Sequence, residues 1–174
     1  MHIPATLTPT EFEQHVHRWL ATVSGGLNEF QVTRLETVTG AGGDYEIDVV
    51  ARFTALGGAD FVVLVECKHH HNPIKREVIQ VLESKLRDVK AHKGMVFSTA
   101  RFQAGALEFA KMHGIATVLV SDAGTQYQTR SFGDRPLPTP GEAIACLCTP
   151  TASGYEATRV DRFHPELLAP WTRP

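Results

Sequence analysis

The sequence has few cysteines, and their spacing does not build a disulfide framework. Its 174 residues contain three, Cys67, Cys146 and Cys148, which is an odd number. Small secreted domains that depend on disulfides carry more cysteines at regular spacings. The low count therefore favours a reducing compartment, and we expect the protein to be cytoplasmic.

The sequence also lacks long apolar runs. No stretch approaches the roughly 20 consecutive apolar residues of a membrane-spanning helix, and the residues after Met1 show neither the basic start nor the apolar core of a secretory signal. No internal repeat or low-complexity tract is visible. We therefore expect a globular protein without a membrane partner.

There is no excess of charge of either sign, which argues against a protein that binds polyanions over its whole surface. The formal net charge is -2 at pH 7. Between Lys68 and Lys93, however, seven Lys and Arg stand against three acids, a local charge of +4. This stretch suits a phosphate backbone, although lysines on a solvated helix face would give the same count. Charge alone leaves both interpretations open.

The composition that is present fits one folded domain. Hydrophobic residues make up 43% and charged residues 21% of the chain, as in ordinary globular proteins. Apolar periodicity and turn signals then predict an order of elements along the chain. The expected elements are a helix capped at Thr8, strands at 30–38, 45–53 and 59–67, a helix at 72–91 capped by Asn72-Pro73, a strand at 95–99, a helix at 102–113 and a strand at 115–120.

This order predicts an α/β sandwich around a mixed sheet. Three consecutive strands can pair as a meander, whereas strand, helix and strand with short connections pair in parallel through a right-handed crossover. We place the core at residues 1–123 and expect 124–174 to be a proline-containing C-terminal extension of unknown role. Within it, residues 135–141 are expected to be extended, and residues 143–148 to form a short strand or a helical turn.

Two carboxylates and an amine stand where a metal-dependent reaction needs them. Asp48 lies in the second strand, and Glu66-Cys67-Lys68 ends the third. Because side chains alternate along a strand, Glu66 and Lys68 share one face and Cys67 points to the other. Mg²⁺ takes oxygen ligands and keeps several waters, so two carboxylates make a sufficient site. The pattern predicts that Asp48 and Glu66 bind Mg²⁺, or Mn²⁺ in its place, for phosphodiester cleavage.

Lys68 has two candidate roles. It could orient the attacking water and stabilise charge on the phosphate, or a pKa lowered by apolar surroundings could make it a base. A plain structural alternative also fits this short pattern, since Glu66 and Lys68 could simply pair on an edge strand. The residues themselves leave these alternatives open.

Several short stretches, taken in order, match a known family. They are Thr10–Glu13, Gly43–Val49, Val65–Lys68, Lys93–Thr99 and the segment from Phe102 to Ile115, together spanning roughly residues 8–121. With them the chain resembles the Mrr-like branch of the restriction endonuclease superfamily, whose core motif is D…ExK. The resemblance implies a restriction endonuclease-like fold of order α-β-β-β-α-β-α-β. It also implies a Mg²⁺-dependent DNA endonuclease of restriction or defence.

The resemblance implies roles for single residues. Asp48 and Glu66 would bind the metal, and Lys68 would serve the attacking water. Glu13 on the first helix and Gln80 on the helix after the third strand match further catalytic positions. For both of these, an exposed place on the polar face of a helix is the alternative.

Other residues near the motif carry weaker expectations. We expect His69, Lys75 and Arg76, which follow the motif closely, to contact nucleic acid. Glu46 departs from the family, which commonly has glycine there. It either adds an acid to the site or faces solvent.

Two further functions remain open at this point. The chain could be a non-catalytic nucleic-acid-binding or regulatory module on the same fold, or a nuclease acting on RNA or on repair intermediates. The intact set of Asp48, Glu66 and Lys68 favours the enzyme. Because no separate DNA-reading domain is evident, we expect a homodimer or a separate specificity partner.

Overall fold

The computed structural model describes residues 7–22, 27–121, 124–131, 145–151 and 154–160. Its elements, in chain order, are α1 (Pro9–Thr22), β1 (Asn28–Gly40), β2 (Gly43–Ala55), β3 (Ala59–Lys68), α2 (Arg76–Val89), β4 (Lys93–Ser98), α3 (Ala104–Met112), β5 (Ala116–Ser121), β6 (Gly124–Thr129), β7 (Ala145–Thr151) and β8 (Gly154–Val160). They fall into two compact units, residues 1–135 and 136–174. None of the described helices has the length and apolar character needed to cross a membrane.

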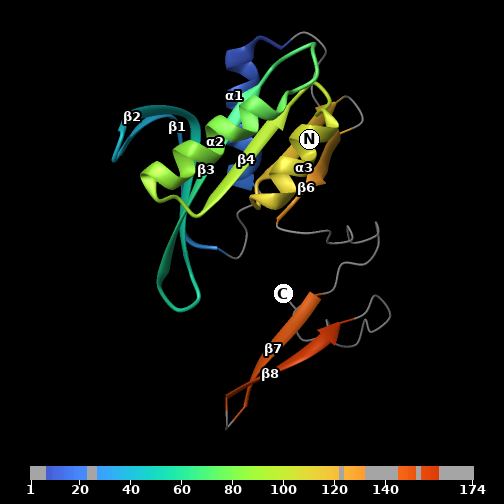
Figure 1. Ribbon diagram of the computed structural model, residues 1–174. Helices are drawn as coiled ribbons and strands as arrows, with labels where there is room; N and C mark the ends of the chain where they lie inside the picture. The colour runs from blue at the N-terminus through green and yellow to red at the C-terminus, as the bar shows by residue number, and fades with distance from the viewer. Residues whose placement is uncertain (1–6, 23–26, 122–123, 132–144, 152–153, 161–174) are drawn as a thin grey trace. The chain divides into compact units, whose positions relative to one another are not determined.

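The first unit is an α/β sandwich, as predicted. Its described strands form one mixed sheet in the order β1-β2-β3-β4-β5-β6. The meander β1-β2-β3 is antiparallel, β3, β4 and β5 are parallel, and β6 returns antiparallel to β5. Figure 1 shows α2 and α3 on one face of this sheet and α1 on the other, and each face buries its own apolar cluster.

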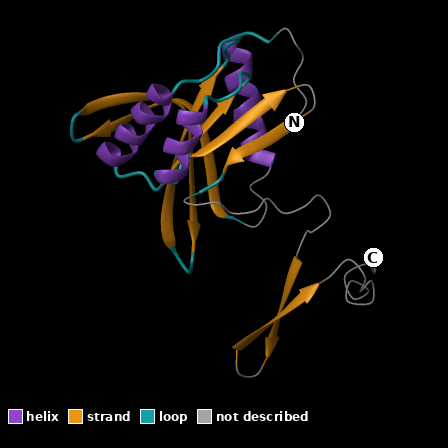
Figure 2. Ribbon diagram, turned by 45° about the vertical axis from the view of Figure 1, so that its right-hand side comes forward, coloured by secondary structure: helices purple, strands orange, loops and turns teal. Residues whose placement is uncertain are grey.

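Strand β6 lies beyond the predicted core. The expected order α-β-β-β-α-β-α-β is present, and the sheet then continues past residue 123 into β6 (Figure 2). The sequence of β6 is Gly-Thr-Gln-Tyr-Gln-Thr, which lacks the apolar alternation of the inner strands. As the last strand in the sheet order it pairs with β5 alone, so it needs fewer buried side chains.

The second unit contributes one described element pair. Strands β7 and β8 pair as an antiparallel hairpin. Of the two alternatives for residues 143–148, the strand is therefore the observed one for residues 145–148. The segment expected to be extended, residues 135–141, lies outside the described residues.

Helix α1 begins as its sequence indicates. The Thr8 hydroxyl accepts a hydrogen bond from the Glu11 backbone N–H at 3.3 Å, and Glu11 Oε2 accepts from the Thr8 backbone N–H at 2.7 Å. This reciprocal arrangement is a capping box. It fixes the start of the helix that carries Glu13.

Helix α2 begins later than predicted. The Asn72-Pro73 pair does not cap it; Lys75 is the N-cap residue and Arg76 the first helical one. Ile74 is instead buried and forms a β-bridge to Phe102. This tertiary contact outweighs the local capping signal, and it moves the start of the helix by one turn.

In the middle of the β1–β2 hairpin, the side chains of β2 switch from one face of the sheet to the other. Val49 packs in the apolar cluster under α1, whereas Ile47, two residues earlier, packs with α2 and α3. In a regular strand these two side chains would share a face. On β1, Leu35 lies between the residues paired with Val49 and Ile47 and has a left-handed φ of 48°. Asp48 lies at this reversal.

The tip of the same hairpin is fastened to α2. The Gly42 backbone N–H donates to both carboxylate oxygens of Asp88, at 3.1 and 2.9 Å. A side chain on Gly40 would collide with the Asp88 carboxylate in its present position, so glycine allows this close approach. The contact between helix and hairpin tip therefore holds the strand that carries Asp48.

Candidate active site

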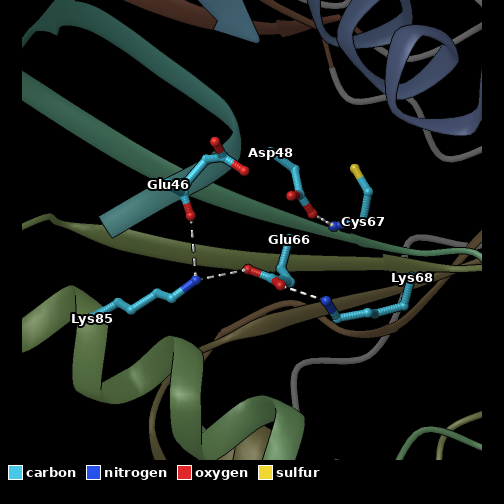
Figure 3. Close-up of polar contacts among 6 residues, drawn as sticks. All are labelled: Glu46, Asp48, Glu66, Cys67, Lys68 and Lys85. Carbon is cyan, nitrogen blue, oxygen red and sulfur yellow. Dashed lines mark hydrogen bonds and ion pairs between the residues drawn. The ribbon is translucent and has the colours of Figure 1, made fainter. Parts of the chain in front are cut away.

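The two predicted metal-binding carboxylates lie where β2 and β3 cease to pair. Backbone pairing of the two strands runs from Ala55 and Ala59 to Val49 and Val65. Asp48 and Glu66 are the next residues on their strands. Past the last pair, Asp48 Oδ2 accepts a hydrogen bond from the Cys67 backbone N–H at 2.6 Å (Figure 3). The Asp48 side chain thus replaces a backbone bond and is fixed against β3.

Glu66 is bound by two lysines. Its Oε1 lies 2.5 Å from Lys68 Nζ, and its Oε2 lies 3.4 Å from Lys85 Nζ. The Glu66 side chain is only 13% exposed, so both ion pairs are partly shielded from water. Glu66 and Lys68 share one face of β3, as alternation predicted.

Cys67 points to the opposite face and is buried in the cluster under α1. Burial is the main reason that its pKa lies above the ordinary value for a thiol. A thiol that stays protonated is a poor nucleophile. Cys67 is therefore a core residue, and its backbone N–H is what serves the site.

Lys85 was not predicted from the sequence. It projects from α2, is 17% exposed, and also donates to the Glu46 backbone carbonyl at 3.5 Å (Figure 3). A signal was present, because Lys85 lies two helical turns after Val78, an apolar residue on the same face of the helix. The same helix face lines a hollow of about 220 Å³ beside the site. The hollow is lined by Glu66, Lys68, Glu77, Val78 and Val81.

The Asp48 carboxylate is held in an unfavourable setting for a negative charge. Burial raises the pKa of Asp48, and the charge of Glu66 raises it further, whereas the hydrogen bond from the Cys67 N–H lowers it. The resulting pKa lies above the ordinary value of an aspartate. A cation close to Asp48 would relieve this destabilisation of the charged form.

Lys68 does not have the lowered pKa that the base role needs. Burial by itself lowers it, but the hydrogen bond and charge of Glu66, with the charge of Asp48, raise it above the ordinary value. The ammonium is therefore charged. This arrangement favours the role of orienting and stabilising over that of base.

Glu13 reaches the site from the other face of the sheet. Its Oε2 lies 3.2 Å from Nη2 of Arg34 on β1. Its charge also contributes to the raised pKa of Asp48, which places the two carboxylates within electrostatic range. The structure thus brings Glu13 near Asp48, as the ion-pair partner of Arg34.

Two other predicted positions do not converge on the site in the same way. Gln80 is exposed on α2 and is not among the residues that line the hollow. Glu46 is exposed as well, and its contact with Lys85 is made by the backbone carbonyl rather than the carboxylate.

The three residues expected to contact nucleic acid are spread around the start of α2. The His69 ring lies 6.0 Å from that of Phe12 on α1, whereas Lys75 is exposed at the N-cap of α2. The Arg76 guanidinium lies over the Phe109 ring of α3, 4.7 Å from its centre. They do not form one cluster.

The donor set fits a hard divalent cation. Within the described residues, no group of three or more His, Cys, Asp and Glu gathers in the manner of a metal cluster. A zinc site needs such a group of protein ligands. Mg²⁺ and similar ions take one or two carboxylates and fill the remaining positions with water and phosphate oxygens. Asp48 and Glu66 therefore suit Mg²⁺ or Mn²⁺.

One solved structure shares the fold, and two others match with lower scores. A protein of unknown function, AF1548, matches with a TM-score of 0.52 and 23% identity, over 63% of this chain and 57% of its own. The restriction endonuclease MspJI in complex with a 27-mer oligonucleotide matches with a TM-score of 0.45 and 19% identity, over 66% of this chain and 26% of its own. The DNA modification-dependent restriction endonuclease AspBHI matches with a TM-score of 0.37 and 14% identity, over 70% of this chain and 34% of its own. The chain thus covers little more than half of AF1548 and less of the other two.

A family comparison goes further than the fold. No curated protein matches the chain significantly. A sequence model of the Mrr catalytic domain, described as restriction endonuclease, matches residues 4–123. That stretch is more than half of the chain, and it contains Asp48, Glu66 and Lys68. The chain therefore belongs to the Mrr-type restriction endonuclease family.

Proposed function

We propose that this protein is a metal-dependent DNA endonuclease that acts in restriction or defence. The observation that carries the proposal is the placement of Asp48 and Glu66 at the point where β2 and β3 separate, with Lys68 on Glu66 at 2.5 Å. Membership of a restriction endonuclease family supports DNA as the substrate.

Each residue has a role in the proposed reaction. Asp48 and Glu66 each offer a carboxylate oxygen to the ion. When bound, Mg²⁺ or Mn²⁺ supplies a water of lowered pKa and neutralises charge on the phosphate. The Lys68 ammonium orients that water and faces the negative charge that develops in the transition state. Because the side chains are partly buried, these interactions are stronger than they would be in open water.

Substrate contacts are proposed around the start of α2. Lys75 is exposed there, and His69 and Arg76 stand within a short loop of Lys68. One site cleaves one strand at a time, so we propose that a second copy of the chain or a separate specificity partner completes double-strand cleavage.

A plasmid assay tests this function. With Mg²⁺ or Mn²⁺, wild-type protein is expected to convert supercoiled plasmid into nicked and linear forms, and excess EDTA is expected to stop the reaction. Plasmids from methylating and non-methylating hosts are used in parallel, because a modified-base preference would hide activity on one of them.

Two results would contradict the proposal. Protein that binds the plasmids but never nicks them would be the non-catalytic module instead. Protein that degrades RNA and leaves both plasmids intact would be a ribonuclease.

A further inference from the structure

Lys85 contacts both strands that carry the proposed metal-binding carboxylates. Its Nζ lies 3.4 Å from Glu66 Oε2 on β3 and 3.5 Å from the Glu46 carbonyl oxygen on β2. These contacts lie beyond the last backbone pair of the two strands, Val49 and Val65. One ammonium group on α2 thus spans the gap that opens between β2 and β3 (Figure 3).

The charges gathered here come close to balancing. Asp48 and Glu66 bring two negative charges, and Lys68 and Lys85 bring two positive ones. The neighbouring ion pair of Glu13 with Arg34 adds no net charge. Glu77, which also lines the hollow, adds one negative charge. A divalent cation entering this set would leave it with an excess of one positive charge.

Lys85 is the lysine that such a cation would meet at Glu66 Oε2. The Lys68 pair is short, at 2.5 Å, and comes from the same strand, whereas the Lys85 pair is longer, at 3.4 Å, and comes from another element. Repulsion between a divalent cation and an ammonium a few ångströms away is substantial in partly buried surroundings. The phosphates of a bound substrate would supply the missing negative charge.

We propose that Lys85 is a counter-charge for Glu66 that makes metal binding depend on bound DNA. It holds the Glu66 carboxylate while the ion is absent and lowers the affinity of the site for metal alone. When substrate phosphates arrive, their negative charge offsets the repulsion between the ion and the ammonium. Lys85 acts through Glu66 and is thus a positioning residue, and this role rests on the function proposed above.

The test measures Mn²⁺ binding by electron paramagnetic resonance, with and without a fully phosphorothioate DNA duplex. Without DNA, Lys85→Met is expected to bind Mn²⁺ at least about tenfold more tightly than wild type, because one repelling charge is gone. Lys85→Arg keeps the charge and is expected to stay within about twofold of wild type. Adding DNA is expected to tighten Mn²⁺ binding more for wild type than for Lys85→Met.

Two further variants make the comparison secure. Lys90→Met removes the same charge from an exposed position just past the end of the helix, and its Mn²⁺ affinity is expected to match wild type. Lys85→Gln keeps a polar side chain and provides the same comparison if the methionine variant does not fold. Far-ultraviolet circular dichroism checks the fold of each variant.

The inference is overturned if the neutral Lys85 variants bind Mn²⁺ no more tightly than wild type, or if Lys85→Arg behaves like them. Failure of the proposed function gives a different result. In that case Asp48→Asn would leave Mn²⁺ binding of the otherwise wild-type protein unchanged, showing that the ion does not use this site.

Discussion

Replacing Asp48 by asparagine is expected to lower the rate of DNA cleavage by about 100- to 1000-fold, and replacing Lys68 by methionine by a similar factor. The asparagine variant loses the charge that is proposed to bind the metal, yet its amide oxygen can still accept the hydrogen bond that Cys67 donates at 2.6 Å. The methionine variant keeps the length of Lys68 but removes the ammonium that is proposed to face the reacting phosphate. Both changes act on chemistry and leave the strands in place.

Initial rates of plasmid nicking at saturating Mg²⁺ measure the effect. Asp60→Asn is the matched control, since it makes the same chemical change at an exposed position near the far end of β3, and it is expected to cleave like wild type. Cleavage at the wild-type rate by Asp48→Asn, or an equal loss in Asp60→Asn, would remove the basis for the catalytic assignment.

Truncating Phe97 to alanine is expected to lower the free energy of unfolding by about 3–5 kcal/mol. Phe97 is fully buried on β4, between β3 and β5 in the sheet. Its ring meets that of Trp19 on α1 edge to face, with centres 5.5 Å apart. The alanine loses this contact and leaves a cavity in the cluster that joins α1 to the sheet.

Urea denaturation followed by circular dichroism measures this change. Phe97→Leu keeps most of the volume, so we expect a cost below about 1.5 kcal/mol. Met112→Ala, at a position 67% exposed, is the surface control and is expected to stay within about 0.5 kcal/mol of wild type. A Phe97→Ala protein as stable as the Met112 variant would show that this core is not packed as described.

Much of the fold is predictable from local patterns. Inner strands such as β3 and β4 are apolar because they are buried on both faces, and the Thr8 cap is a signal contained within four residues. Strand β6 is largely polar because it lies at an edge, and the start of α2 depends on the contact of Ile74 with Phe102, far along the chain. Signals that depend on distant partners are not visible in a local window.

The same distinction applies to the site. Alternation along one strand was enough to place Glu66 and Lys68 on a common face, and their ion pair confirms it. Lys85 reaches Glu66 only because α2 packs over β3. The reversal of β2 at Asp48, opposite the left-handed Leu35, likewise depends on the pairing of two strands.

Anomalous diffraction from a crystal grown with Mn²⁺ would test the metal site most directly. We predict an anomalous peak held by the carboxylates of both Asp48 and Glu66, at the point where β2 and β3 separate. A peak at other residues, or no peak near Asp48 and Glu66 at saturating Mn²⁺, would contradict the metal-dependent nuclease proposed for this protein.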